Sequence, residues 1–351
     1  MCEASVNRST LSALLLVATF PACLDQRSDA TPDAETQADT TSPDTATQAD
    51  TTLPSGDTQA DVEPSGDTSG PLSDAEIVNP GAAQIISDFE TTTVLPQSVA
   101  RLSVSTSSEL GESLRYRWSV QQPVGSVSRF VPSNEDPTPT FEMNVAGDYT
   151  FYVQVLDANA VPDQVLATAS LFMRAVPGSD LHISLTWRTP GDPDESDTGG
   201  GGGFSAGSDV DLHVLRTDRG KTWFNWDDDC YWESPTQSWA PSTEGSVSLD
   251  RDDTDGAGPE NTNLSGWLPA SLSVGVHYWS DWGYGKSLAT VRIYLRGELI
   301  EEWSDVEIRN GDLWHSHTID GATGAATRVT VAGSDAPSIT PEYPINTGLP
   351  F

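Results

Sequence analysis

The sequence has few basic residues, few cysteines and no long apolar run, and each shortage argues against a class of protein. Lys and Arg number 17 against 52 Asp and Glu in 351 residues, which gives a formal net charge of −35. A surface this acidic repels a phosphate backbone, so nucleic acid is not expected as a partner. Three cysteines are too few for a disulfide scaffold. The longest apolar run, Leu11–Phe20, is about half of the roughly 20 residues that a membrane-spanning helix needs, which excludes a polytopic membrane protein.

Residues 1–23 have the order of a secretory signal peptide: a short polar start with Arg8, the apolar stretch Leu11–Phe20, and small residues before Cys23. The run Phe20-Pro21-Ala22-Cys23 resembles the lipobox of bacterial lipoproteins, although Phe20 and Pro21 depart from its usual residues. That resemblance implies lipidation of Cys23 and a cell-envelope location, at the outer membrane or cell surface. An ordinary signal peptide, which would leave a secreted protein, is the alternative.

Residues 24–76 are predicted to form a disordered linker. The segment consists mainly of Asp, Thr, Ala, Pro, Ser and Gly, and it carries 13 acidic residues against the single Arg27. Thr-Gln-Ala-Asp recurs at 36–39, 47–50 and 58–61, and these copies contain too little apolar surface to bury as a repeat fold. Self-repulsion would keep such a chain extended.

The rest of the chain is predicted to be all-β, with one β-sandwich over residues 77–176, because its apolar runs lack a helical period. Strands are expected at Val99–Val104, Leu114–Val120, Thr150–Leu156 and Val165–Met173. The Tyr116-Arg117-Trp118 run and the Gly-x-Tyr of residues 147–149, opening a strand that closes at Asp157, resemble PKD-like, immunoglobulin-type modules of bacterial surface proteins. That resemblance implies a spacer or adhesion module in which Trp118 fills the core.

A second β-sandwich is predicted over residues 180–332, followed by an irregular tail over 333–351. Its expected strands are His182–Trp187, Val210–Arg216, Leu272–Tyr278, Thr290–Leu295 and Leu299–Trp303. The stretch Gly191–Ser208 contains consecutive glycines at 199–203 and is expected to be a mobile loop.

Two acidic elements in this second part predict a calcium site. Strand alternation places Asp209, Asp211 and His213 on one face of their strand. The turn Asp253-Thr254-Asp255-Gly256 is typical of calcium loops, in which glycine lets carboxylate and carbonyl oxygens converge. Its spacing does not fit an EF-hand. The predicted Ca²⁺ ligands are Asp209, Asp211, Asp252, Asp253, Asp255 and Glu260.

Two other interpretations of these residues stay open. The Asp253–Gly256 segment can be a hydrated turn of an acidic protein. Alternatively, His213 and His277 can join Asp211 as zinc ligands of a metal-dependent hydrolase. No His-Glu-x-x-His arrangement supports the second option, and Cys230 has no recognisable base nearby.

The Asp-x-Asp-Leu-His run from Asp209, the later Asp-Gly-x-Gly-Pro-Glu run ending at Glu260, and the His277-Tyr278-Trp279 segment resemble the YfaP-like (DUF2135) domain of bacterial envelope proteins. The resemblance implies a β-sandwich of poorly defined biochemical role. The glycine-rich insertion before Asp209 and the aromatic-rich segment Trp223–Trp239 depart from it.

Aromatic residues are dense in the second part, and some are expected to be exposed. Trp223, Trp226, Trp279 and Trp282 are candidates for stacking against a polysaccharide or protein ligand, while burial beneath the loops is the alternative. Together the sequence predicts a non-enzymatic, lipid-anchored envelope protein: a calcium-stabilised binding or adhesion module on an acidic stalk. The alternative is the hydrolase that uses Asp211, His213 and His277.

Overall fold

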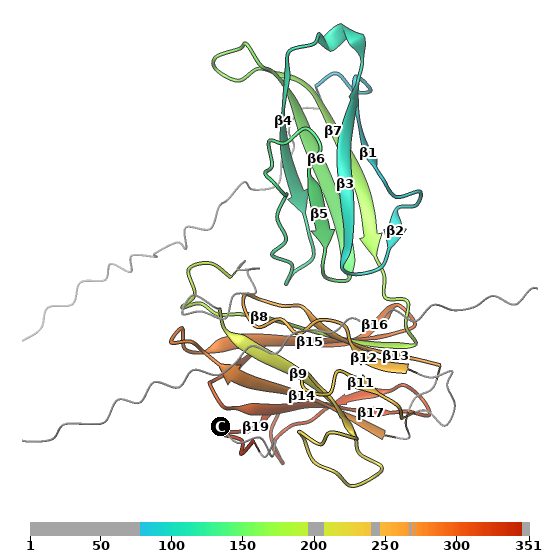
Figure 1. Cartoon of the computed structure of the whole chain (residues 1–351), viewed down its shortest axis with the longest axis vertical. Coiled ribbons are helices and arrows are strands. Elements are labelled where there is room, and N and C mark those ends of the chain that lie inside the picture. The colour runs from blue at the N-terminus through green and yellow to red at the C-terminus, as the bar shows by residue number, and fades with distance from the viewer. Residues whose placement is uncertain (1–77, 196–206, 240–245, 267–268, 270, 346–351) are drawn as a thin grey trace, which may run out of the picture. The chain divides into compact units, whose positions relative to one another are not determined.

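The computed structural model describes residues 78–195, 207–239, 246–266, 269 and 271–345 (Figure 1). These residues form β-strands and one short 3-10 helix, Ser108–Leu110, which confirms the predicted all-β fold. No helix among them is long and apolar enough to cross a membrane. The predicted signal peptide, the predicted lipidation site Cys23, the predicted linker and the glycines at 199–203 lie outside the described residues.

The strands before residue 176 pair into two sheets, ordered β1-β3-β5 and β2-β7-β6-β4. The strands are β1 (Ala83–Ser87), β2 (Thr93–Val94), β3 (Ser98–Thr106), β4 (Leu114–Gln121), β5 (Thr140–Met143), β6 (Gly147–Asp157) and β7 (Val165–Ala175). All four strands expected from the sequence in this region are confirmed, within β3, β4, β6 and β7.

The two sheets share one hydrophobic core. Leu102 of β3 and Phe141 of β5 pack with Trp118 of β4 and Phe151 of β6 in a single cluster. Trp118 is 1% exposed, and its indole nitrogen donates to the carbonyl of Asp136 at 2.9 Å. The prediction that Trp118 fills the core is therefore confirmed, and its one polar atom is satisfied inside the core.

The strands after residue 180 form two six-stranded sheets. One has the order β11-β12-β13-β8-β15-β16; the other runs β10-β9-β14-β17-β18, with β19 also paired to β17. The strands are β8 (Leu181–Arg188), β9 (Asp209–Arg216), β10 (Asp229–Cys230), β11 (Thr236–Gln237), β12 (Ser246–Leu249), β13 (Glu260–Ser265), β14 (Ser271–Ser280), β15 (Ser287–Leu295), β16 (Glu298–Ile308), β17 (Leu313–Asp320), β18 (Ala326–Arg328) and β19 (Ser338–Thr340). The five strands expected here are confirmed within β8, β9, β14, β15 and β16.

These two sheets also share one hydrophobic core. Leu185 and Trp187 of β8 pack with Leu212 of β9 and Val276 of β14 in one cluster. Both faces of β9 are buried, which the sequence does not predict for the face that carries Asp211 and His213. The reason is that Phe224 and Tyr231 form a smaller apolar cluster over the second face of this sheet.

The predicted irregular tail contains one short strand, β19. Ile339 of this strand packs against the core, and Ser338–Thr340 pair with Leu313–His315 of β17. A strand of three residues leaves too little periodicity to be recognised in the sequence.

Candidate metal centre

The start of β9 and the start of β13 meet through one glutamate side chain. On one side, β9 pairs with β14 along its length. On its other side, β10 pairs only with Val214 and Leu215, which leaves a gap beside the first half of β9. Glu260, the first residue of β13, covers this gap: its Oε2 accepts from the Leu212 backbone N–H at 2.7 Å, and its Oε1 accepts from the Asp253 N–H at 3.1 Å. The carboxylate therefore connects the strand that carries Asp211 to the acidic loop, residues 250–259 between β12 and β13.

Asp211, Asp252 and Glu260 form the centre of the cluster. Each offers a carboxylate oxygen, and these oxygens lie within 4.8 Å of one another. Asp211 is 2% exposed and Glu260 is fully buried, while Asp252 is exposed. The Oδ2 atom of Asp211 has no hydrogen-bond partner among the described residues. A buried carboxylate oxygen without a partner is costly unless a cation or proton compensates it.

The pKa values of these carboxyl groups show chiefly the cost of their burial. Burial, opposed by His213 and reinforced by Asp252, raises the pKa of Asp211 to about 7. The pKa of Glu260 is raised well above its usual value, chiefly by burial and then by Asp211. Burial also raises the pKa of Asp252. The centre thus resists holding all its negative charges at neutral pH without a counter-ion.

The remaining predicted ligands lie beside this centre. Burial and the charges of the neighbouring aspartates raise the pKa of Asp209 to about 8. Burial and then Asp255 raise the pKa of Asp253 to about 7. Asp255 is itself buried. The structure therefore brings all six predicted ligands into one electrostatically linked region, with Asp211, Asp252 and Glu260 closest together.

The acidic loop lies in contact with β8. The backbone N–H of Trp187 donates to the backbone carbonyl of Ala257 at 3.1 Å. Gly258 has a φ of +80°, and a Cβ at this position would lie 2.9 Å from Trp187 Cζ3 and 3.0 Å from the Leu185 carbonyl oxygen. Only glycine fits this conformation and this close approach without strain. The Gly-Pro-Glu sequence therefore places Glu260 accurately at the start of β13.

Sequence reasoning missed Asp192, another buried carboxylate of this region. Its Oδ1 accepts from the Asp194 N–H at 3.0 Å, whereas its Oδ2 is buried without a hydrogen-bond partner in the described structure. That Oδ2 lies 3.0 Å from where a Cβ of Gly207 would stand, and the nitrogen of Gly256 lies 2.5 Å from the same point. Asp192 lies in the glycine-rich stretch that the sequence predicts to be a mobile loop, so it was not recognised as a candidate ligand.

The histidines of the hydrolase alternative are arranged differently. His213 Nδ1 lies 2.8 Å from Asp229 Oδ2, and both side chains are fully buried. His277 Nδ1 lies 3.6 Å from Asp211 Oδ2, but burial and then His213 lower the pKa of His277 to about 3, so it remains neutral and provides no counter-ion. Among the described residues, the set Asp211, His213 and His277 is not a group whose ligand atoms all lie within 4.8 Å.

The four candidate tryptophans divide into packed and exposed residues. Trp223 lies over β14, where a Cβ on Gly275 would stand 3.0 Å from its ring. Trp279 is half-buried, with its ring centroid 5.4 Å from that of Trp232. Trp226 and Trp282 are 60% and 48% exposed. These last two are the rings that are available to a ligand.

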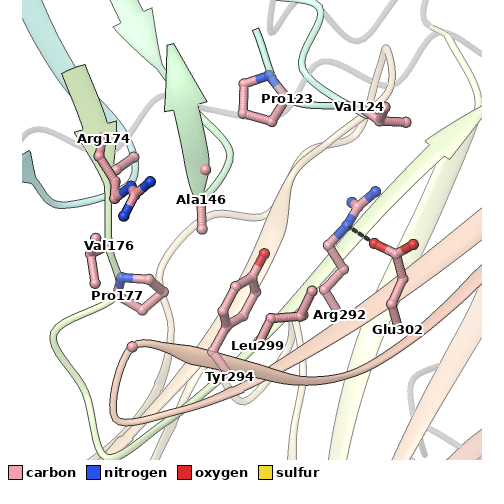
Figure 2. A pocket seen from close by; sticks show the side chains of 13 residues that line it. Pro123, Val124, Ala146, Arg174, Val176, Pro177, Arg292, Tyr294, Leu299 and Glu302 are labelled. Atoms are coloured by element: carbon pink, nitrogen blue, oxygen red, sulfur yellow. Dashed lines mark hydrogen bonds and ion pairs between the residues drawn. The ribbon is translucent and has the colours of Figure 1, made fainter. Parts of the chain in front are cut away.

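Two other features do not add to the site. Cys230 is buried, and burial raises the pKa of its thiol to about 12, so it does not act as a nucleophile at neutral pH. Figure 2 shows a pocket lined in part by Arg292, Tyr294 and Glu302, none of which is a predicted site residue. Arg292 Nε donates to Glu302 Oε2 at 2.6 Å, so the charge of this arginine is already paired.

No protein-family model matches this chain, and no curated protein sequence is significantly similar to it.

Proposed function

We propose that this chain is a non-enzymatic protein of the cell envelope, whose C-terminal part is a binding module stabilised by Ca²⁺. The observation that carries the proposal is the Asp211 carboxylate, 2% exposed and with an unpartnered Oδ2, beside Asp252 and Glu260. A cation is the simplest compensation for such a group at neutral pH.

The chemistry of the group favours calcium. All the converging ligand atoms are carboxylate oxygens, which hard cations prefer. Oxygens within 4.8 Å of one another are close enough for any two of them to share one ion at about 2.4 Å, the distance typical of Ca²⁺. Exposed Asp252 gives the ion access from solvent, while Asp211 and Glu260 bind it from the interior. A zinc hydrolase receives less support, because no histidine nitrogen belongs to this group.

Electrostatics would make the ion a stabilising ligand. Two carboxylates at this spacing repel by roughly 1 kcal/mol in water and several times more at the effective dielectric of a protein surface. Because the ion binds the folded site and hardly binds the unfolded chain, Ca²⁺ at about 100 times its dissociation constant adds roughly 2.7 kcal/mol of stability.

Thermal melts of the full chain test this proposal. We expect the wild type to melt at a higher temperature in millimolar Ca²⁺ than in chelator, and Asp252→Asn to lose most of that increment. Asp227→Asn is the matched control, because Asp227 is an exposed carboxylate of the same part of the chain. Coincident wild-type curves in chelator and calcium would reduce the cluster to a solvated turn and overturn the proposal.

The modules around the site are part of the same proposal. We assign an anchor at Cys23, an acidic linker, a PKD-like sandwich and a YfaP-like sandwich. The Tyr149 hydroxyl donates to the Val145 carbonyl at 2.8 Å, which resembles the tyrosine corner of immunoglobulin-type folds and supports the PKD-like assignment.

The ligand that we propose for the module is an envelope or extracellular polysaccharide, recognised by stacking on Trp226 and Trp282. Their exposure, 60% and 48%, supports this role, since tryptophan is enriched at interfaces, where it offers an apolar ring and a polar N–H. Affinity-gel retardation in cell-wall polysaccharide tests it: we expect Trp226→Ala and Trp282→Ala to migrate faster than the wild type. Equal mobility of all three proteins with and without polysaccharide would overturn the assignment.

A further inference from the structure

We propose that the exposed ring of Trp282 is positioned by the metal centre through a buried chain of hydroxyl groups, so that calcium regulates ligand binding at this ring. The identity of the ion and of the ligand rests on the proposed function. The link between the two sites is new, and it gives a positioning role to four residues: Thr189, Ser208, Tyr278 and Ser287.

The hydroxyl groups of these four residues form one continuous chain in the interior, where all four are fully buried. Oγ1 of Thr189 is hydrogen-bonded to Oγ of Ser208 and, at 2.6 Å, to Oγ of Ser287. Ser287 Oγ donates to the hydroxyl oxygen of Tyr278 at 2.9 Å. Tyr278 donates in turn to the carbonyl oxygen of Gly285 at 2.7 Å. The chain therefore runs from the residue that precedes β9 to the loop between β14 and β15.

The number of protons fixes the direction of this chain, because each hydroxyl group has one proton to donate. The Ser287 proton goes to Tyr278, so the bond between Thr189 and Ser287 requires Thr189 as its donor. Ser208 must then donate to Thr189. Ser208 Oγ accepts from the indole N–H of Trp187 at 3.1 Å. The hydrogen bonds thus point one way, from Trp187 towards the loop, and bonds aligned in this way strengthen one another.

Trp187, at the start of the chain, also contacts the acidic loop. Its backbone N–H donates to the carbonyl of Ala257 at 3.1 Å. Its ring lies against Gly258, where a Cβ would stand 2.9 Å from ring atom Cζ3. The residue that donates to Ser208 is therefore held by the loop that carries Asp252, so an ion that orders this loop also orders the start of the hydroxyl chain.

The Trp282 loop, residues 281–286 between β14 and β15, lies at the other end of the chain. Its backbone N–H at Tyr284 donates to the carbonyl of Asp281 at 2.7 Å, which closes a turn around Trp282. Trp282 has a φ of +43°, a conformation that a bulky side chain adopts only where its surroundings impose it. The bond that Gly285 accepts from the hydroxyl chain is a contact with the interior that holds this loop in place.

The other exposed tryptophan of the proposed ligand site, Trp226, lies outside this chain. Its carbonyl accepts from Ser234 Oγ at 2.9 Å and from Gln237 Nε2 at 3.1 Å, and neither residue belongs to the chain. Calcium should therefore affect the two rings differently. Ligand binding through Trp282 is strengthened by the ion, whereas binding through Trp226 is not.

Hydrogen exchange of the full chain, measured by mass spectrometry of peptides that cover residues 281–286, tests the link. In the wild type we expect the amides of Gly283 and Tyr284 to exchange more slowly in millimolar Ca²⁺ than in chelator. In Tyr278→Phe we expect their exchange in calcium to be about five-fold faster than in the wild type, the factor that corresponds to one hydrogen bond of typical net strength. We also expect this variant to lose the calcium dependence of exchange in the loop.

Two controls show whether the effect is local. Tyr294→Phe removes the hydroxyl group of a buried tyrosine that is not part of the chain and should exchange like the wild type. The amide of Asp228, two residues after Trp226, should exchange alike in Tyr278→Phe and the wild type. Circular dichroism verifies that each variant is folded, and Ser287→Ala replaces Tyr278→Phe if the latter does not fold.

The outcomes separate this inference from the proposed function. Equal exchange of the Trp282 loop in the wild type and Tyr278→Phe, or a calcium dependence that persists in Tyr278→Phe, would overturn the role of the hydroxyl chain. A melting temperature that calcium raises without slowing exchange in this loop would overturn the link and leave the metal site. No effect of calcium on melting or on exchange would overturn both.

Discussion

Asp211 is the carboxylate on which the proposed cation site chiefly depends. It is 2% exposed, its pKa is raised to about 7, and its nearest histidine, His277, is neutral. Without an ion, the protein must either protonate this carboxyl group or bear its charge in the interior. With an ion, the same charge becomes a source of stability.

Replacing Asp211 should therefore have opposite effects in the two conditions. In chelator at pH 8 we expect Asp211→Asn to melt at a higher temperature than the wild type, because the substitution removes a buried uncompensated charge. In millimolar Ca²⁺ we expect the wild type to be the more stable protein, because the substitution deletes a ligand. Differential scanning calorimetry in both buffers measures this reversal. A shift of the same sign and size in both buffers would mean that Asp211 has only a packing role.

The stability of the metal-free protein should fall as pH rises from about 6.5 to about 8. The pKa values of Asp209, Asp211 and Asp253 are raised to about 8, about 7 and about 7, whereas an unfolded Asp titrates near 3.9. The folded state therefore holds more protons than the unfolded state in this range, so stability decreases with rising pH.

Below about pH 6.5, the buried histidines oppose this trend. The pKa values of His277 and His317 are lowered to about 3 and about 4, chiefly by burial, so protonation of the unfolded state destabilises the protein as pH falls. Urea denaturation in chelator across pH 6.5 to 8 measures the predicted loss of stability. A free energy of unfolding that is flat or rises over this window would contradict the carboxylate account.

The sequence could identify Asp211 but not Asp192, for a physical reason. Asp211 lies in an apolar strand, where a charged residue stands out against its neighbours. Asp192 lies among Gly, Pro and other acidic residues, and its burial depends on Gly207 approaching Gly256. Such a contact between distant segments leaves no local pattern in the chain.

At the scale of elements, β13 shows why one strand of the site could not be predicted, although its residue Glu260 was. Its sequence, Glu-Asn-Thr-Asn-Leu-Ser, is polar, yet Glu260, Asn261 and Thr262 are at most 1% exposed. Apolar strands such as β8 and β14 were recognisable because their burial matches their hydrophobicity. A buried polar strand is specified instead by its neighbours, β12 and β8, which pair with it on both sides.

The acidic loop should depend on Gly258 more than on a glycine of similar backbone conformation elsewhere. Gly258 and Gly220 have φ values of +80° and +68°, but only at Gly258 would a Cβ clash with neighbouring atoms, while nothing lies within 4 Å at Gly220. We expect Gly258→Ala to destabilise the protein by more than about 1 kcal/mol and to reduce calcium stabilisation, with a smaller effect from Gly220→Ala. Chemical denaturation of both variants in calcium and in chelator makes the comparison. Equal effects would indicate backbone strain alone.

At the scale of the whole molecule, the proposed anchor and the proposed calcium site predict separable properties. We expect Cys23→Ala to move the full chain from the detergent phase to the aqueous phase when it is expressed in a bacterial host. Its calcium-dependent melting should not change, because Cys23 lies outside the sequence that forms the metal centre. Detergent phase partitioning measures the first property. Recovery of wild type and variant alike in the aqueous phase would contradict the lipid anchor.

The all-β class and the nine expected strands were predictable from the chain because alternation and apolar runs are local signals. The pairing order of the sheets was not, since β13 joins β8 and β9 joins β14 across long sequence separations. The convergence of β9 with the loop before β13 depends on that pairing. The candidate ligand residues could therefore be proposed from motifs. Their positions relative to one another could be known only from the folded structure.

Calorimetric titration of the chelator-treated full chain with Ca²⁺ tests the central claim most directly. We predict saturable binding to the wild type, retained in Asp57→Ala of the predicted linker and strongly weakened in Asp211→Asn. An absence of saturable heat in the wild type, or the same binding isotherm for wild type and Asp211→Asn, would contradict a calcium site at this cluster.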